Sequence, residues 1–260
     1  MLSRLLVPRT KFLTQALVAI ILLATSLVVA AEPLRVAVSP DYKPMAFKRD
    51  GQLVGIEIDN AQAVANVLGR KVQFVEMRME QFIPALEIGK VDVVMSGFSV
   101  TPERQAQVDF AEPFMEIGQM VIVRTADVVR FSAPMALYAN GVRIGVEPGT
   151  TGEKYAIEHF SRAELQNFRN PSDAFAALRS KVTDAYIHDA PTSWMLATSK
   201  EDQDLFSLYR LLTEENLAWA VRKGNVVMLG QLNAALEKLR TNGHLRAIQN
   251  SWIPVTIEVR

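Results

Sequence analysis

Residues suited to binding a carboxylate follow a strand-like apolar run at residues 91–95. The segment Ser96-Gly97-Phe98-Ser99 supplies a glycine and two hydroxyl groups, and Arg104 follows on a short predicted helix. In open α/β sheets, ligands bind at the carboxyl ends of strands, and glycine lets the backbone approach a ligand closely. The guanidinium group of arginine matches a carboxylate with two parallel hydrogen bonds. This spacing therefore predicts a site for the carboxylate of a small molecule, although a strand, a loop and a solvated Arg104 would show the same pattern.

A second candidate anion site lies at residues 147–151. Glu147 follows an apolar run, and Thr150 and Thr151 stand where the next helix is expected to begin. The free N–H groups and the positive dipole end of a helix favour an anion. Threonines that only cap the helix N-terminus would explain the same residues.

Asp189 is the candidate anion of the same site, because it ends a strand-like run that begins at Asp184. An aspartate at this place is also a common helix N-cap. His188 neighbours Asp189, although a lone histidine beside a strand end is more often structural. We assign Asp184 to structure, Asp41 to a turn and Asp59 to a helix cap.

The N-terminus has the order of an export signal. Basic residues between Arg4 and Lys11 are followed by an apolar stretch, residues 12–24, and by small residues up to Ala31. This apolar run is shorter than the roughly 20 residues of a membrane-spanning helix. We therefore expect residues 1–31 to be a signal peptide, cleaved near Ala31, and the mature protein to be periplasmic.

Composition excludes several classes of function. The chain has no cysteine, so neither a disulfide framework nor a lipid-modified cysteine is expected. Its 28 basic and 28 acidic residues balance, and no basic patch indicates a nucleic-acid partner. No metal-spaced set of side chains and no glycine-rich phosphate loop appears. We expect no cofactor.

The pattern of apolar runs predicts an α/β protein with two similar β-α series. Asp50-Gly51 predicts a hairpin turn ahead of the first helix. Strands are expected at 34–38, 72–75, 91–95, 120–123, 142–146, 165–168, 184–187 and 217–221, and helices after Asp59, at 82–88, after Thr150, at 172–179, at 191–197 and towards the C-terminus.

The chain resembles the amino-acid-binding branch of the bacterial periplasmic solute-binding proteins of ABC importers. Three strings carry the resemblance: Ser96 to Arg104 with Val108-Asp109-Phe110-Ala111-Glu112-Pro113-Phe114, then Glu147-Pro148-Gly149-Thr150-Thr151, and Asp184 to Asp189. The resemblance implies a two-lobe periplasmic-binding-protein fold, with a hinge of two crossover strands and a ligand cleft between the lobes. The implied boundaries are lobe one at 32–114 and 218–260, lobe two at 119–212, and hinge segments at 114–118 and 213–217.

The resemblance also implies a receptor for a free amino acid. Arg104 would hold the ligand carboxylate with the two hydroxyl loops, and Asp189 would hold the ammonium group. Tyr42 and Met79 would form a wall, while Met45 replaces a usual phenylalanine. Ser39 stands where some receptors for basic amino acids carry aspartate, which argues against such a ligand unless Glu147 points into the cleft. The expected ligand-binding residues are Ser39, Tyr42, Met79, Ser96, Gly97, Phe98, Ser99, Arg104, Glu147, Thr150, Thr151, His188 and Asp189.

We expect a monomer that captures an amino acid and delivers it to an ABC permease in the inner membrane. One alternative is a cyclohexadienyl dehydratase, because some enzymes of this fold convert prephenate or arogenate. Thr192 stands where the resemblance places the glutamic acid of those enzymes, which argues against that chemistry, although Glu147 could replace the acid. Another alternative is a sensory protein that hands its ligand state to a receptor.

Overall fold

The computed structural model describes residues 31–208 and 210–253, and the compact unit of the chain begins at Pro33. The predicted signal peptide, residues 1–31, lies outside these described residues except for Ala31. Within the described ranges, no helix combines the length and the apolar character needed to cross a membrane.

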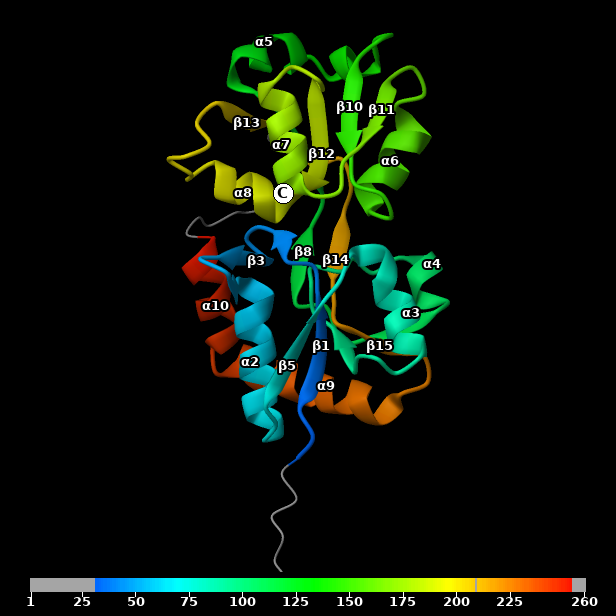
Figure 1. Cartoon of the computed structure of the whole chain (residues 1–260), viewed down its shortest axis with the longest axis vertical. Coiled ribbons are helices and arrows are strands. Elements are labelled where there is room, and N and C mark those ends of the chain that lie inside the picture. Colours follow the sequence, from blue (N-terminus) through cyan, green and yellow to red (C-terminus); the bar gives the residue numbers. More distant parts are fainter. Residues whose placement is uncertain (1–30, 209, 254–260) are drawn as a thin grey trace, which may run out of the picture. The chain divides into compact units, whose positions relative to one another are not determined.

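A five-stranded sheet with the order β5-β1-β6-β15-β7 forms the first lobe (Figure 1). The first three of these strands are parallel, and β15 runs antiparallel between β6 and β7. The strands are β1 (Leu34–Val38), β5 (Val72–Glu76), β6 (Val93–Val94), β7 (Val108–Phe110) and β15 (Ala220–Arg222). The same lobe contains the hairpin strands β2 (Asp41–Tyr42), β3 (Ala46–Arg49) and β4 (Gln52–Val54), the 3-10 helix η1 (Met79–Gln81), and the helices α2 (Ile56–Leu68), α3 (Phe82–Glu87), α4 (Pro102–Gln105), α9 (Val226–Thr241) and α10 (His244–Trp252).

A second five-stranded sheet, with the order β11-β10-β12-β9-β13, forms the other lobe. The strands β10 (Arg143–Val146), β11 (Glu164–Asn167) and β12 (Ala185–Asp189) pair in parallel, whereas β9 (Gln119–Arg124) pairs antiparallel with both β12 and β13 (Leu205–Leu208). The helices of this lobe are α5 (Val128–Phe131), α6 (Thr151–His159), α7 (Pro171–Arg179) and α8 (Ala190–Leu196), with the 3-10 helices η2 (Thr125–Asp127) and η3 (Pro134–Tyr138).

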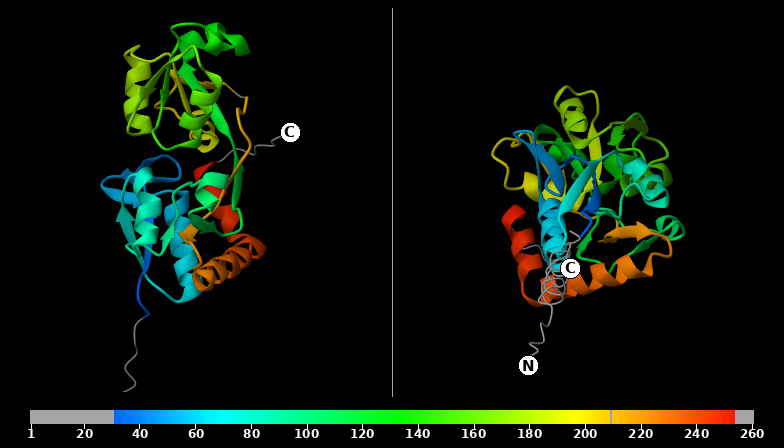
Figure 2. Two further views of the ribbon diagram at one scale, coloured as in Figure 1. Left: turned by 90° about the vertical axis from the view of Figure 1, so that its right-hand side faces the viewer. Right: turned by 60° about the horizontal axis from the view of Figure 1, so that its bottom comes forward.

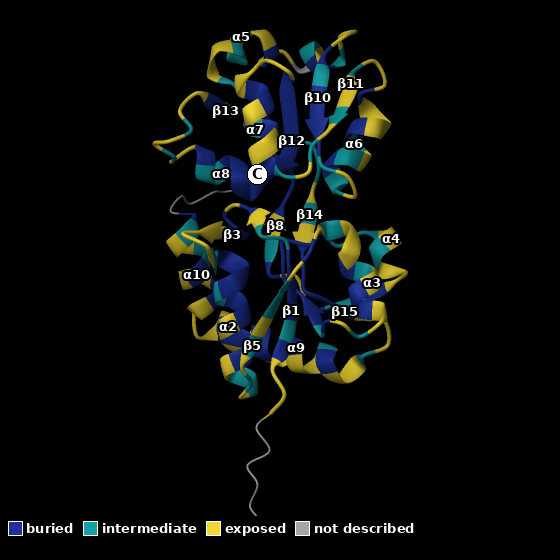
Figure 3. Ribbon diagram, viewed as in Figure 1, coloured by how far each residue is buried: buried dark blue, intermediate teal, exposed yellow. Residues whose placement is uncertain are grey.

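The central strands are mostly apolar because structure covers both faces of each sheet. In β1, Val36 and Val38 belong to the core cluster under α2 and α9, whereas Ala37 belongs to the cluster with α3. All five residues of β12 are buried, as Figure 3 shows for this strand. Buried strands of this kind point their carboxyl ends at one edge of each sheet, where a site can form.

Two extended strands connect the sheets. β8 (Met115–Ile117) and β14 (Glu215–Leu217) pair antiparallel and run between the lobes (Figure 2). Beside them, a Cβ atom at Gly118 would lie 2.0 Å from the carbonyl oxygen of Thr213, so only glycine fits this close approach. This arrangement supports the predicted hinge segments at 114–118 and 213–217. We retain as a proposal both this hinge and the lobe boundaries, with lobe one at 32–114 and 218–260 and lobe two at 119–212.

The structure confirms several local predictions. Asp50 and Gly51 both have positive φ, 52° and 76°, as a two-residue hairpin turn of type I′ requires. Arg104 stands on the short helix α4, as predicted, and Thr101 caps this helix by accepting a hydrogen bond from the backbone N–H of Arg104. Thr150 likewise caps α6 by accepting one from the N–H of Glu153.

Three local predictions were wrong or incomplete. Asp59 does not cap α2, because the carbonyl groups of Pro44 and Met45 accept hydrogen bonds from the first free N–H groups of that helix. Asp59 instead accepts a hydrogen bond from the indole of Trp252. The strand expected at 217–221 is divided between β14 and β15, since the chain passes there from the hinge into the first sheet. The strand β13 was not predicted.

Candidate ligand-binding site

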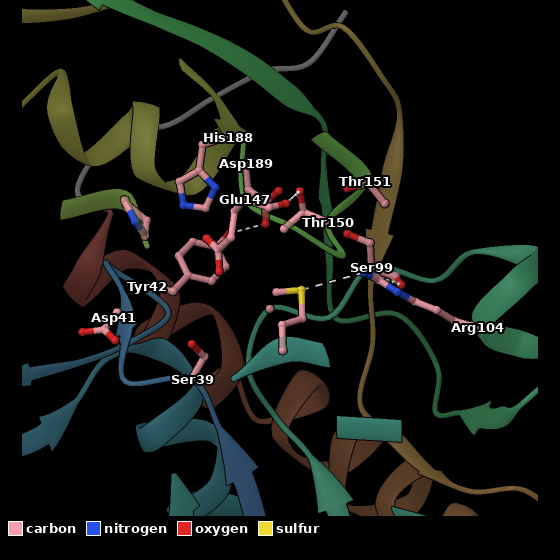
Figure 4. A pocket seen from close by; sticks show the side chains of 13 residues that line it. Ser39, Asp41, Tyr42, Ser99, Arg104, Glu147, Thr150, Thr151, His188 and Asp189 are labelled. Atoms are coloured by element: carbon pink, nitrogen blue, oxygen red, sulfur yellow. Dashed lines mark hydrogen bonds between the residues drawn. The ribbon is translucent and has the colours of Figure 1, made fainter. Parts of the chain in front are cut away.

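A narrow cavity lies where the two lobes face each other, and Figure 4 shows its side chains. The cavity volume is about 10 Å³, close to the minimum that holds one water molecule. A larger ligand therefore enters only when the lobes separate or a lining side chain turns away. The lining residues are Ser39, Asp41, Tyr42, Met79, Gly97, Ser99, Arg104, Glu147, Thr150, Thr151, Pro171, His188 and Asp189.

Arg104 supplies the positive charge of this cavity. One guanidinium nitrogen donates to the carbonyl oxygen of Ser99 at 2.8 Å, and another donates across the cleft to that of Gly149 at 3.0 Å. The group lies 4.0 Å from the ring centroid of Phe98, which fixes its plane. Burial lowers the pKa of Arg104, and no carboxylate of the described chain hydrogen-bonds to it. A carboxylate brought by a ligand would supply that missing partner.

Asp189 supplies a buried negative charge opposite, at the end of β12. Its side chain is 6% exposed and accepts hydrogen bonds from the Tyr42 hydroxyl, at 2.6 Å, and from the side-chain amide of Gln119. Asp189 stands at the N-cap position of α8 but makes no side-chain capping bond. Burial, and next the charge of Glu215, raise the pKa of Asp189 to about 6, while the hydrogen bonds oppose that rise. The carboxylate is thus ionised at neutral pH, and no cationic side chain among the described residues hydrogen-bonds to it.

His188 forms part of the wall and carries no charge. Burial lowers the pKa of its imidazole to about 3. Its ring lies 4.8 Å from that of Tyr42 and 5.4 Å from that of Tyr186, measured between centroids. His188 therefore presents a neutral aromatic surface next to Asp189.

Glu147 and the two threonines approach the cavity from the second lobe. Burial, together with the charges of Asp189 and Asp41, raises the pKa of Glu147 to about 8. The hydroxyl of Thr150 donates to the carbonyl oxygen of Glu147 at 2.7 Å, and the hydroxyl of Thr151 donates to Glu215 at 2.8 Å. Both hydroxyl protons are therefore engaged within the protein.

The structure brings all the predicted site residues to this cavity except Ser96 and Phe98. The Ser96 hydroxyl accepts a hydrogen bond from the N–H of Ser39 at the end of β1, so Ser96 joins two strand ends. Phe98 packs in the core of the first lobe, and its ring contacts the guanidinium group of Arg104. Met45 is also a core residue.

Asp41 was predicted to be a turn residue, but it lies on β2 and lines the cavity, because β2 pairs with β3 and turns that side of the hairpin towards the cleft. Sequence reasoning also missed Gln119, Glu215, Pro171 and Glu57. Fully buried Glu57 accepts hydrogen bonds from the N–H of Gly97 and the indole of Trp219, which holds the binding loop against the strand after the hinge. An acid on the apolar face of α2 was the only signal for Glu57.

The profile of one protein family, the bacterial extracellular solute-binding proteins of family 3, matches residues 34–255. The chain belongs to this family. The receptor accordingly has the two-lobe α/β fold of periplasmic binding proteins that its motifs predicted.

Relatives of the receptor agree with this assignment. It is 30% identical over 236 residues to ABC transporter arginine-binding protein 1 of Escherichia coli (strain K12), an alignment that covers 86% of this chain and 92% of the relative. An ancestral amino-acid-binding protein described as a precursor of cyclohexadienyl dehydratase superposes with a TM-score of 0.80 at 35% identity, covering 85% of this chain and 95% of the other. An ancestral arginine-binding protein bound to arginine superposes with a TM-score of 0.78 at 34% identity, covering 85% and 97%.

Proposed function

We propose that this solute-binding protein captures a cationic L-amino acid, such as arginine, and delivers it to an ABC importer. Capture of an amino acid for such an importer follows from the family and its amino-acid-binding relatives. The preference for a cationic side chain is our inference from the charges of the cavity.

One observation carries this preference: three carboxyl groups, Asp41, Glu147 and Asp189, line the cavity against one guanidinium, Arg104. A zwitterionic ligand brings one negative and one positive group, which pair with Arg104 and Asp189. The remaining acids then face the ligand side chain. A guanidinium or ammonium group there would pair with Asp41 and draw the proton from buried Glu147, whose pKa of about 8 otherwise keeps it protonated at neutral pH, whereas a neutral side chain would offer neither acid a charged partner.

Ser39 stands where some receptors for basic amino acids carry an aspartate, which argues against a cationic ligand. Two other acids of the cavity can take the place of that aspartate. Asp41 lines the same cavity two residues further along the chain, and Glu147 faces it from the other lobe. The carboxylate that Ser39 lacks is thus available from neighbouring positions.

Calorimetry with purified mature protein tests the preference. L-Arginine should bind more tightly than L-glutamine, and Glu147→Gln should reduce the ratio of their affinities by about tenfold, the equivalent of ~1.4 kcal/mol. Glu158→Gln, an exposed change on the helix that follows Glu147, is the matched control. Equal affinities in the wild-type protein would refute the cationic preference while leaving amino-acid capture intact.

A dehydratase is the second candidate, because Glu147 has the raised pKa of a general acid and one structural relative is described as a dehydratase precursor. Against it, Thr192 is buried and its hydroxyl donates to the carbonyl oxygen of Lys43 at 2.7 Å. We therefore propose that the protein is not an enzyme. Incubation with prephenate and with arogenate, followed by chromatography, should yield no sustained phenylpyruvate or phenylalanine.

We also propose that the mature protein is a periplasmic monomer that begins after Ala31. Intact-mass measurement of periplasmic material and light scattering test these statements. Uptake of labelled ligand by vesicles that contain the partner permease tests delivery. Binding without any stimulation of uptake would favour the sensory alternative.

A further inference from the structure

Behind Asp189, a set of polar side chains links the cavity to the hinge. Gln119 begins β9 and is 1% exposed, and its side-chain amide nitrogen faces three acceptors. One is a carboxylate oxygen of Asp189, the second is the Thr151 hydroxyl at 2.9 Å, and the third is a carboxylate oxygen of Glu215 at 3.2 Å. The amide can have only one orientation here, because its carbonyl oxygen would repel two carboxylates.

Glu215 stands on the hinge strand β14 and does not line the cavity. Its carboxylate accepts hydrogen bonds from the Thr213 hydroxyl at 2.6 Å, the Thr151 hydroxyl at 2.8 Å and the Gln119 amide. The Thr213 hydroxyl also accepts one from the backbone N–H of Gln119 at 2.9 Å. Glu215 therefore joins both crossovers to the N-terminus of α6.

Gly152 leaves room for this arrangement. A Cβ atom at that position would lie 2.7 Å from the side-chain carbonyl oxygen of Gln119. The side-chain nitrogen faces Asp189, Glu215 and the Thr151 hydroxyl, while the carbonyl oxygen lies next to Gly152 and, among the described residues, has no hydrogen-bond partner. The two carboxylates therefore select this orientation of Gln119, and a side chain at position 152 would obstruct it.

We propose that Glu215 is a positioning residue of the ammonium site, acting through Gln119 on Asp189. Glu215 holds the Gln119 amide in place, and this amide occupies one carboxylate oxygen of Asp189. The ammonium group of the ligand then competes with the Tyr42 hydroxyl for the other oxygen. The negative charge of Glu215 adds to the potential that attracts the ammonium group. This inference rests on the proposed binding of an amino acid at Asp189.

A structural role for Glu215 in tying the hinge strands predicts a different outcome. Such a role would weaken every ligand alike, because closure would suffer whatever the ligand carries. A positioning role affects only ligands that have an ammonium group at Asp189. L-Arginine and its deamino analogue, 5-guanidinopentanoate, separate these outcomes, since they differ only in that group.

Calorimetry at pH 7.5 compares both ligands on Glu215→Gln. We expect the affinity for L-arginine to fall about tenfold, since hydrogen bonds to charged groups are the stronger ones, while that for 5-guanidinopentanoate changes less than about twofold. Glu214→Gln, an exposed change of the same type on the same crossover, should alter neither affinity. Equal losses for both ligands on Glu215→Gln would overturn the proposal.

Gln119→Leu is the second variant, and it removes the link between the two acids. It should show the same ammonium-selective loss, and the double variant should be no weaker than the stronger single variant. Losses that multiply would show that Glu215 does not act through Gln119. A wild-type protein that binds no amino acid would refute the proposed function itself, and that outcome is distinct from an unselective loss on Glu215→Gln.

Discussion

Asp189→Asn tests the candidate site most directly. The substitution keeps the shape of the side chain and removes only its charge. Removing one partner of a desolvated charge pair costs roughly 2–5 kcal/mol. Salt screens this pair little, because Asp189 is 6% exposed. We therefore expect the affinity for L-arginine to fall at least about thirtyfold, at ~1.4 kcal/mol for each tenfold change.

The same variant should keep or gain stability, which separates a binding defect from a folding defect. Burial raises the pKa of Asp189 from 3.8 to about 6. Each tenfold change in an ionisation equilibrium is ~1.4 kcal/mol, so ionised Asp189 costs the folded protein up to about 3 kcal/mol. Asparagine removes that cost, and it retains an acceptor for Gln119 and gains a donor for the Tyr42 oxygen.

Titration calorimetry with L-arginine and urea unfolding without ligand provide the two measurements. Asp50→Asn is the matched control, because Asp50 lies in an exposed hairpin turn with a φ of 52°, which asparagine tolerates. A folded Asp189→Asn variant that binds L-arginine within threefold of wild type would falsify the assignment of Asp189 to the ammonium group. A large loss of stability would show that the two hydrogen bonds, rather than the ligand, require the charge.

Three further predictions concern charge and closure. Arg104→Ala should weaken L-arginine binding about thirtyfold or more but change the affinity for agmatine, which lacks the carboxylate, far less; equal losses in calorimetry would contradict the role of Arg104. Asp189, Glu147 and Glu57 have folded-state pKa values of about 6, 8 and 7, above their ordinary values, so these groups hold more protons in the folded protein without ligand than in the unfolded chain. Buried His188, with its pKa lowered to about 3, opposes them by a single proton, and only below about pH 6.5. The unfolding free energy of the protein should therefore be highest near pH 5 and fall as the pH rises to 8, with a shallower fall in Glu147→Gln; urea midpoints across this range that rise instead would refute the burial argument. Small-angle scattering should show a smaller radius of gyration after L-arginine is added, and tight binding without compaction would count against hinge closure.

The strings of neighbouring residues predicted that Arg104 and Asp189 lie at one cavity, and the structure places both there; that they hold a ligand stays a prediction. Arg104 and Asp189 each follow a buried strand, and the order of strands along the chain places both strand ends at the cleft. The pairing of β8 with β14 is consistent with the predicted hinge segments, which stay a prediction. The division of residues 217–221 between two strands was not predicted, because a continuous apolar run contains no signal for a change of sheet.

The supporting residues could not be predicted, since their contacts join distant parts of the chain. Gln119 meets Glu215 across a sequence separation of 96 residues, and Glu57 meets Trp219 across 162. Each is a single polar residue without a local motif. Only the pairing of the two crossovers and the packing of α2 reveal what these side chains do.

The hydrogen bond from Tyr42 to Asp189 means that a bound ligand replaces one hydrogen-bond donor of Asp189 with another. A side chain from one lobe already satisfies the anion of the other, so the arriving ammonium group competes with a phenol for the same oxygen. The measured dissociation constant is then the intrinsic one divided by the fraction of molecules in which that oxygen is accessible. Natural variation at position 42 could tune how long the receptor holds its cargo without altering any residue that recognises the ligand's charges.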